Sequence, residues 1–299
     1  MKQSTKALLA VFCGNSIFGF SFLASRLILS RTSVFVLLST RFLLAFLIMN
    51  LLVLTGVCKL KLRGKNVWGV VLLGICQPVT YFICESYGIS LTNSSFSGTL
   101  IAMVPIFALF FAAVMIGEKF KLSQLFWAVC SVVGVVIISI DNSDDSPVTL
   151  LGIILLLGAV MTGALFNVIS KKTSSEFSPF ERTYVMFALA ASVFTVCALF
   201  ETSGRLPIIV AELVRDPYFT LPLIFLTLFS SVIAFWLLNY ATTYIPVRQT
   251  SIFSCLSTVV SIIAGIVFLH EPFGGIRQVI GSVLILAGVY MVSIAGEKK

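Results

Sequence analysis

Charged residues are scarce in this sequence. Asp, Glu, Lys and Arg together make up 11% of the chain and hydrophobic residues make up 59%, whereas a soluble domain carries about 25% charged residues. So few charges do not cover a water-soluble surface, and apolar runs of about twenty residues recur from end to end. The sequence therefore predicts an all-α integral membrane protein, for which the bilayer is the solvent.

Motifs of enzymes, nucleotide-driven pumps and metal sites are missing as well. The chain has no HExxH, GxSxG or GxxxxGK[ST] pattern, its one histidine is His270, and its seven cysteines form no CxxC pair. Those patterns supply the zinc site of metalloproteases, the nucleophile of hydrolases and the phosphate loop of ATPases. We therefore expect no enzyme activity, no metal site, no cofactor and no disulfide framework.

Ten apolar segments have the length of a transmembrane helix. A helix needs about 20 residues to cross the hydrocarbon, and the segments lack the alternation that is typical of membrane β-strands. The sequence thus predicts ten transmembrane helices, at residues 7–29, 34–55, 67–90, 95–116, 122–140, 149–169, 183–200, 219–241, 247–269 and 275–295.

The net charge of +8 is distributed as in a membrane protein. If the N-terminus is cytoplasmic, fourteen basic residues fall on the inner side and five on the outer side, in agreement with the positive-inside rule. We therefore expect a multi-pass protein of the plasma (inner) membrane with both termini cytoplasmic, surrounded by lipid and not bound to nucleic acid. The fourteen inner residues are Lys2, Lys6, Lys59, Lys61, Arg63, Lys65, Lys119, Lys121, Lys171, Lys172, Arg182, Arg248, Lys298 and Lys299.

The chain divides into two similar halves. Aligning Glu118 with Glu271 places Phe82 opposite Phe235, with other sparse identities between the halves. An odd number of helices in each half turns the second half upside down relative to the first, which is the plan of many secondary transporters. The sequence therefore predicts two inverted five-helix repeats, at residues 1–140 and 149–299, joined by an acidic outer linker at residues 141–148.

Four short motifs follow one another along the chain in a fixed order. They are FGFSF at residues 18–22, Arg41-Phe42, LIAMVPIF at residues 100–107 before Gly117-Glu118, and LHEP at residues 269–272. In this order the sequence resembles the drug/metabolite transporter superfamily, specifically its ten-helix EamA-type members, over essentially its whole length. The resemblance implies a secondary transporter that exports a small metabolite, such as an amino acid or an amphipathic compound, by alternating access.

The second half departs from the first at two motif positions. Thr258 stands where the first half has Pro105, and His270 stands where the first half has Gly117. Any proline hinge is thus expected to be stronger in the first half.

Two other functions stay open. A nucleotide-sugar or phosphate-ester exchanger would need several cations in its cavity, and only Arg41 lies clearly inside a predicted helix, with Arg248 near a helix end. A channel or receptor-like membrane component would be expected to show long soluble domains or a repeated pore motif. Proton coupling is one candidate energy source, and the sequence does not indicate an oligomeric state.

The third predicted helix carries a polar face. Gln77, Tyr81 and Glu85 recur at helical spacing and so project in the same direction. Ionisable residues within a membrane are functional candidates, because they are costly against lipid and point into the bundle or a wet cavity. The other interpretation is that Gln77 and Tyr81 only form hydrogen bonds to neighbouring helices.

Arg41 and Glu85 are expected at similar depth in the membrane. Each charge alone costs about 2.5–3.5 kcal/mol at the centre of a transmembrane helix, which predicts that they pair. Such a pair is either structural or part of a site for substrate or protons, and the sequence leaves both interpretations open.

Polar and aromatic residues of both halves complete a predicted substrate cavity between helices one, three, six, eight and nine. Asn15 with Gly19 in helix one resembles Asn167 with Gly163 in helix six. Aromatic side chains would suit flat or cationic solutes, although Phe often faces lipid and serines often only pack helices. The predicted cavity residues are Asn15, Phe22, Arg41, Gln77, Tyr81, Glu85, Asn167, Trp236, Asn239, Tyr240 and Ser254.

Overall fold

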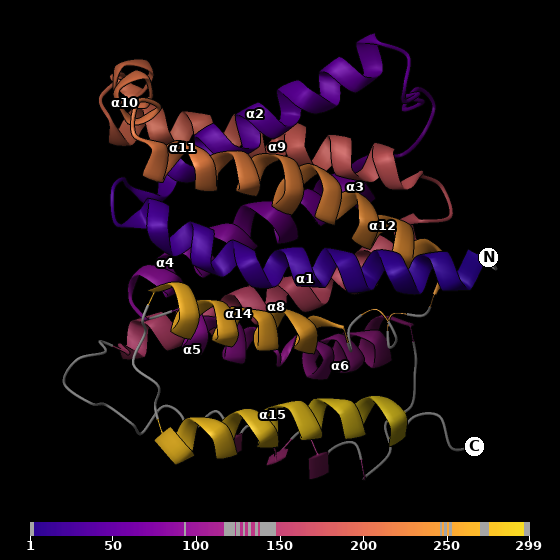
Figure 1. Cartoon of the computed structure of the whole chain (residues 1–299). Helices are drawn as coiled ribbons and strands as arrows, with labels where there is room; N and C mark the ends of the chain where they lie inside the picture. The colour runs from indigo at the N-terminus through magenta and orange to yellow at the C-terminus, as the bar shows by residue number, and fades with distance from the viewer. Residues whose placement is uncertain are drawn as a thin grey trace.

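The structure of the protein, a computed structural model, is all-helical in the residues that it describes (Figure 1). These residues are 3–92, 94–116, 148–245, 247, 250, 253–269 and 275–295, together with single positions between 123 and 137. The all-α class expected from the composition is confirmed for this part of the chain.

The helices of the first half follow the predicted segments closely. The first two are α1 (Gln3–Leu29) and α2 (Val34–Leu54). The third segment consists of α3 (Trp68–Gly74), η1 (Ile75–Thr80) and α4 (Tyr81–Ser90), and the fourth consists of α5 (Ser94–Ile101) and α6 (Val104–Ile116). The predicted fifth helix, at residues 122–140, lies outside the described residues except for single positions.

The second half contains one helix that the hydropathy pattern did not predict, α10 (Leu206–Leu213), which is too short to cross a membrane. α9 (Pro179–Glu201) begins with a capping box, in which the side chain of Ser178 and the carboxylate of Glu181 satisfy two backbone amides at the helix start. The other helices of this half are α8 (Leu150–Thr173), α11 (Pro217–Ile224), η2 (Phe225–Ile233), α12 (Ala234–Tyr244), α14 (Ser254–Leu269) and α15 (Gly275–Ala295).

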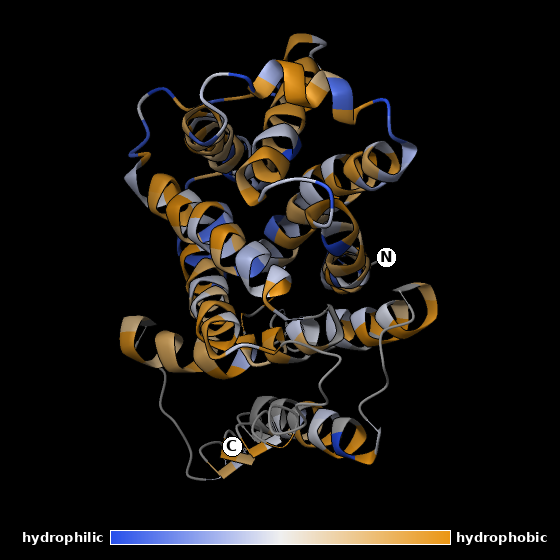
Figure 2. Ribbon diagram, turned by 90° about the vertical axis from the view of Figure 1, so that its left-hand side faces the viewer, coloured by the Kyte–Doolittle hydropathy of each residue, from blue (hydrophilic) through white to orange (hydrophobic). Residues whose placement is uncertain are grey.

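The exterior of the bundle is apolar, as a bilayer requires. Large side chains such as Leu54 (83% exposed) and Phe200 (82% exposed) point outward, and hydrophobic residues cover much of the ribbon in Figure 2. Six helical stretches are long and apolar enough to cross a membrane, and α6, α14 and α15 contain shorter apolar stretches. The six candidate spans are Gln3–Leu29, Val34–Leu54, Trp68–Ser90, Leu150–Thr173, Pro179–Glu201 and Pro217–Tyr244.

Two helices of the first half are interrupted near prolines. Gln77 leaves helical geometry with φ −149° and ψ 121°, directly before Pro78. Ala102 and Met103 form a turn between α5 and α6, directly before the Val104-Pro105 start of α6. Proline has no N–H to continue the helical ladder, which explains why the breaks fall here. Both breaks lie beside the cavity described below.

The helices of the two halves are interleaved. α1 lies between α12 and α14, α2 packs on α9, and α4 packs on α8, whereas α15 lies along α6 at the edge of the bundle (Figure 1). The bundle has an N-terminal end, where α1 begins, and an opposite end, where α1 turns into α2. Because each half packs mainly on the other, a space at the centre is lined by both.

Aromatic rings from both halves fill the core beside that space. Phe42 lies 5.2 Å from Phe82 and 5.4 Å from Phe187, measured between ring centroids. Phe235 lies 5.6 Å from Phe187 and 6.0 Å from Phe82. The two phenylalanines that the sequence alignment made equivalent, Phe82 and Phe235, therefore lie next to each other.

Candidate functional site

A cavity of about 60 Å³ lies between the two halves. One water molecule needs about 10–15 Å³ in this measure, so the space holds about four to six water-sized groups. Its wall comes from α1, the broken third segment, α5, α6, α8, α12 and α14, with Thr250. The predicted residues on this wall are Asn15, Phe22, Gln77, Tyr81 and Glu85 from the first half, and Asn167 and Ser254 from the second.

The face of the third segment lies on the cavity as its spacing indicated. Gln77, Tyr81 and Glu85 are all more than nine-tenths buried and all line the cavity. Tyr81 packs so closely on α8 that a Cβ at Gly163 would lie 3.1 Å from its ring. The glycine thus allows the Tyr81 ring to lie against α8, one turn away from Glu85.

Two asparagines in corresponding helices present their amides in the same way. The amide nitrogen of Asn15 donates to the Val11 carbonyl at 2.8 Å, and that of Asn167 donates to the Gly163 carbonyl at 3.1 Å. A carbonyl oxygen only accepts, so each amide nitrogen faces its own helix. Each side chain keeps its Oδ1 acceptor and one further amide N–H.

The hydroxyl residues of the ninth predicted helix divide into two groups. Thr250, Ser254 and Ser257 line the cavity. Thr258 instead donates to the Gly98 carbonyl at 2.7 Å, and a Cβ at Gly98 would lie 2.1 Å from the Ser261 Oγ. Thr258 and Ser261 therefore serve the close packing of α14 on α5.

Arg41 is buried beside the cavity but does not line it. Its Nε donates to the Ser231 hydroxyl at 2.8 Å and its Nη2 to the Ser230 hydroxyl at 3.0 Å. Its guanidinium lies 4.3 Å from the centroid of the Phe82 ring, which is a cation–π contact. The two ion pairs found within the described residues involve other side chains, so the direct pairing of Arg41 with Glu85 expected from their depth is wrong.

Arg41 does not pair with Glu85 because its side chain points toward η2, where two serine hydroxyls accept its hydrogen bonds, and because its guanidinium lies on the Phe82 ring. Its attraction to the Glu85 carboxylate acts at longer range. The Glu85 oxygens are consequently left without a cationic partner among the described residues.

Asn239 lies outside the cavity, in a network around Arg182. The Asn239 amide nitrogen donates to the Thr183 hydroxyl at 2.9 Å, and its Oδ1 accepts from the Ser170 hydroxyl at 2.9 Å. Arg182 donates to the Ser170 carbonyl and to the Asn239 carbonyl, at 2.6 Å each. Arg182 is 0% exposed, so its assignment to a cytoplasmic loop is a correction to the sequence interpretation.

Sequence reasoning missed Arg182 because α9 begins at Pro179, four residues before the predicted helix start at residue 183, so Arg182 lies in its first turn. The Ser-Pro-Phe-Glu sequence that starts at Ser178 is the signal that would have placed Arg182 inside the helix. Removing Arg182 from the inner basic residues leaves the charge asymmetry in the same direction.

Trp236 and Tyr240 also lie away from the cavity. Trp236 is 38% exposed and its ring packs on Phe180, with 6.0 Å between centroids. Tyr240 packs on Tyr244 with 4.8 Å between ring centroids, and it is not among the described residues that line the cavity. The aromatic part of the wall is formed instead by Phe18, Phe22, Tyr81, Phe82 and Phe166.

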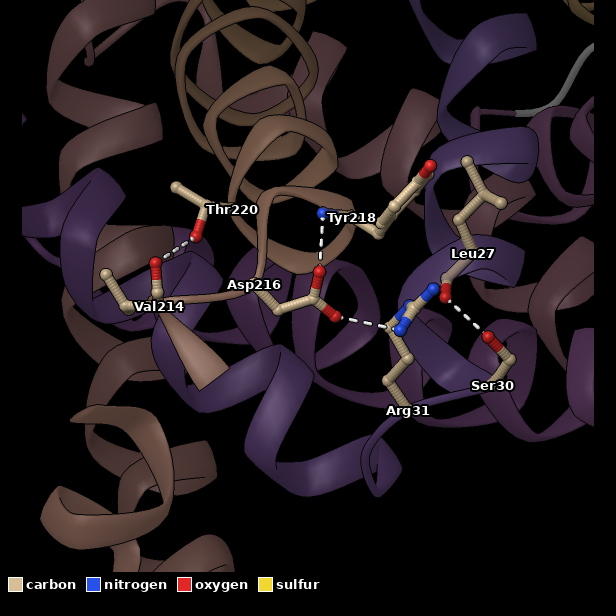
Figure 3. A network of polar contacts seen from close by, with 7 residues as sticks. All are labelled: Leu27, Ser30, Arg31, Val214, Asp216, Tyr218 and Thr220. Carbon is tan, nitrogen blue, oxygen red and sulfur yellow. Dashed lines mark hydrogen bonds and ion pairs between the residues drawn. The ribbon is translucent and has the colours of Figure 1, made fainter. Parts of the chain in front are cut away.

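Each end of the bundle has an ion pair between the halves. At the opposite end, Arg31 pairs with Asp216 at 2.8 Å (Figure 3). At the N-terminal end, Lys65 pairs with Glu181 at 2.8 Å, and the Lys61 amide donates to the same carboxylate at 2.9 Å. These contacts hold the α1–α2 turn and the loop before α3 on the second half.

Within the described residues no group of three His, Cys, Asp or Glu side chains is arranged to hold a metal ion. A polar cavity inside a multi-pass helical bundle instead defines a membrane transporter. The chain belongs to the EamA-like transporter family, whose model matches residues 5–140 and 150–294. Members of this family are transporters and not enzymes.

Relatives of the chain bear the same description. The chain is 32% identical to the "Uncharacterized transporter YcxC" of Bacillus subtilis (strain 168), over 99% of this chain and 96% of that protein. It is 25% identical to an "Uncharacterized transporter" of Archaeoglobus fulgidus, over 92% of this chain and 94% of that protein. A solved crystal structure superposes with a TM-score of 0.66 at 16% identity, covering 98% of both chains, and shows the fold alone.

Proposed function

We propose that the protein is a secondary transporter of the plasma membrane that exports a small metabolite by alternating access, with the central cavity as its substrate site. The observation that carries the proposal is that the polar wall of the cavity combines Gln77, Tyr81 and Glu85 of the first half with Asn167 and Ser254 of the second. Relative motion of the halves would expose such a site to one side of the membrane at a time.

Pseudo-symmetry supports this proposal. Asn15 and Asn167 both lie on the wall, each with its amide nitrogen bonded four residues back on its own helix. Phe82 and Phe235, which occupy equivalent positions in the two halves, also pack on each other, as expected if a pseudo-symmetry axis passes between them. We propose that the halves are inverted five-helix repeats with both termini cytoplasmic, which places the Lys65–Glu181 contact inside and the Arg31–Asp216 contact outside.

The cavity favours a small solute over the phosphate-ester alternative. About 60 Å³ is far too little for a nucleotide sugar, and the described residues that line the space include neither Lys nor Arg. An amino acid or an amphipathic compound, moved with or without a coupled proton, fits better.

Cysteine labelling tests the site. On a cysteine-free background, Asn15→Cys, Tyr81→Cys and Asn167→Cys should react with a water-soluble thiol reagent, and substrate should protect them. Asn239→Cys is the matched control, because the Arg182 network buries that side chain completely. Equal reactivity at all four positions, or inertness of the three wall positions, would contradict the proposed site.

Counterflow in proteoliposomes tests transport itself. Purified protein should exchange at least one solute from a panel of amino acids, lipophilic amines and sugar phosphates, and the same solute should protect the wall cysteines. A proton gradient should change net accumulation if protons are coupled. A reporter fused to the C-terminus that is active only outside the cytoplasm would contradict the proposed orientation.

A further inference from the structure

The polar groups of the cavity wall are mostly hydrogen-bond acceptors. Asn15 and Asn167 each use one of their two amide N–H groups within their own helix, and neither Oδ1 receives a bond from the described part of the chain. A ligand in the cavity therefore meets two amide oxygens from opposite halves.

The hydroxyl groups on the wall repeat this pattern. Thr250 donates its hydroxyl hydrogen to the Val247 carbonyl at 2.9 Å, and Ser257 donates to the Ser254 carbonyl at 2.6 Å. A hydroxyl that has used its one hydrogen keeps only acceptor lone pairs. Both oxygens therefore add to the acceptors available to a ligand.

Among the described residues of this wall, Glu85 supplies the one carboxylate. Tyr81, one turn earlier, and Arg41 both attract the carboxylate, yet Arg41 uses its own N–H groups on Ser230 and Ser231. The carboxylate thus forms no ion pair within the described residues and keeps acceptor capacity for a ligand.

We propose that the cavity binds the protonated amine of a small, largely apolar solute, and that Glu85 selects for its charge. The inference rests on the proposed function, whose substrate class it names. An ammonium group has three N–H donors and no acceptor, which complements Glu85 and the two asparagine oxygens. The rings of Phe18, Phe22 and Phe166 surround the space, where aromatic faces also attract a cation.

The same wall disfavours ligands that bring acceptors of their own. A carboxylate or phosphate would face these oxygen lone pairs and the Glu85 charge, with only the neutral amide N–H groups of Gln77, Asn15 and Asn167 as donors among the described amides of the wall. Room for about four to six groups matches a short amine. An amino acid, which carries both charges, should bind less well than the amine alone.

Three solutes with the same four-carbon chain test the inference. We would measure binding of radiolabelled n-butylamine to the purified full-length protein, with norvaline and pentanoate as competitors. Norvaline adds a carboxylate to the amine, and pentanoate replaces the amine with a carboxylate. Butylamine should bind saturably, and each competitor should need at least ten times the concentration of unlabelled butylamine to displace it.

Variants assign the effect to the wall. Glu85→Gln should weaken butylamine binding at least ten-fold, whereas Glu212→Gln, on the exposed face of α10, should leave it unchanged. The double variant Asn15→Leu, Asn167→Leu should weaken it at least three-fold, and it serves in place of Glu85→Gln if that protein does not elute as a single species.

The inference is overturned by absence of saturable butylamine binding, by displacement at equal concentrations of pentanoate, or by a monodisperse Glu85→Gln protein with wild-type affinity. Its failure remains distinct from failure of the transport proposal. Counterflow of another solute that protects cysteines at Asn15 and Asn167 would leave transport standing while amine selectivity falls.

Discussion

Arg41 and Arg182 are both buried completely among helices, and neither forms an ion pair within the described residues. Different groups stabilise the two buried charges. Arg41 donates to two serine hydroxyls of η2 and lies on the face of Phe82. Arg182 donates to the Ser170 carbonyl near the end of α8 and to the Asn239 carbonyl near the end of α12.

Helix direction accounts for the position of Arg182. α8 ends at Thr173, three residues after Ser170, so the charge of Arg182 faces the negative end of the α8 dipole, and the Asn239 carbonyl and the Thr243 hydroxyl of α12 accept from its other arm. Arg41 meets the middle of a helix, where that field is absent, and needs side-chain partners instead. A buried cation in this bundle therefore needs no carboxylate, and the Glu85 carboxylate is correspondingly free of a direct cation.

The largest expected effect follows from removing Arg182. Arg182→Met should destabilise the folded protein by about 3 kcal/mol or more, because hydrogen bonds to a charged group contribute about 1.5–3 kcal/mol each and two helix ends lose their donor. The monodisperse fraction after heating measures this. Lys172→Met, at the same end of α8 but exposed, is the control and should change it little. Equal loss in both variants would contradict the capping role.

Arg182→Lys sharpens the result. A lysine ammonium keeps the charge but lacks the planar fork that reaches both helices. We expect it to recover only part of the lost stability, and full recovery would mean that charge alone matters.

Removing Arg41 should have an intermediate effect. Arg41→Gln loses two charge-assisted bonds and a cation–π contact, but it also relieves the cost of burying a charge, so about 1–3 kcal/mol of stability should be lost. The same heating assay measures the change. A loss as large as that of Arg182→Met would contradict the difference between the two sites.

The contrast between these arginines also shows which structural features can be predicted from the sequence and which cannot. Long apolar runs predict where helices lie, and the i, i+4 spacing of Tyr81 and Glu85 predicts their shared face, because both patterns are local. Arg41 and Glu85 were predicted to pair from depth alone. Depth does not include rotation about the helix axis, and rotation turns Arg41 toward Ser230 and Ser231.

Asn239 and Arg182 are a second case in which local sequence patterns did not predict the contacts of a side chain. An asparagine in an apolar helix suggested a cavity, yet the partner that satisfies it lies on α9, more than fifty residues earlier in the chain. Its partners depend on how α8, α9 and α12 pack, which no local pattern records. Trp236 was misplaced for the same reason, since the face that it occupies on α12 is set by its neighbours.

A smaller effect is expected when Arg41 and Glu85 are changed together. Because no direct ion pair joins them, Glu85→Gln should leave stability nearly unchanged, and the double variant should be about as unstable as Arg41→Gln alone. The two buried charges still attract each other at longer range, so the coupling energy should lie at the low end, about 0.5 kcal/mol, of the range for interacting residues. Heating curves for the four proteins of this cycle measure it. Strong recovery in the double variant would restore the ion pair that the depths suggested.

The smallest expected effect belongs to the exposed pair at the opposite end of the bundle. The side chains of Arg31 and Asp216 are 39% and 33% exposed, and such pairs contribute about 0–1 kcal/mol. Asp216 has a second role, because its carboxylate accepts from the Tyr218 amide at 2.9 Å and so caps α11 (Figure 3).

Three substitutions separate these two roles. Asparagine keeps a good N-cap and loses only the charge, whereas alanine loses both, and loss of a cap costs about 1 kcal/mol. Arg31→Gln and Asp216→Asn should therefore lower the free energy of unfolding by the same small amount. High salt screens the ion pair, so this difference from the wild type should disappear in high salt. Asp216→Ala should lower the free energy of unfolding further. If Asp216→Asn were as unstable as Asp216→Ala in high salt, the charge would matter at an exposed site as it does at Arg182, and the contrast between buried and exposed cations in this protein would fail.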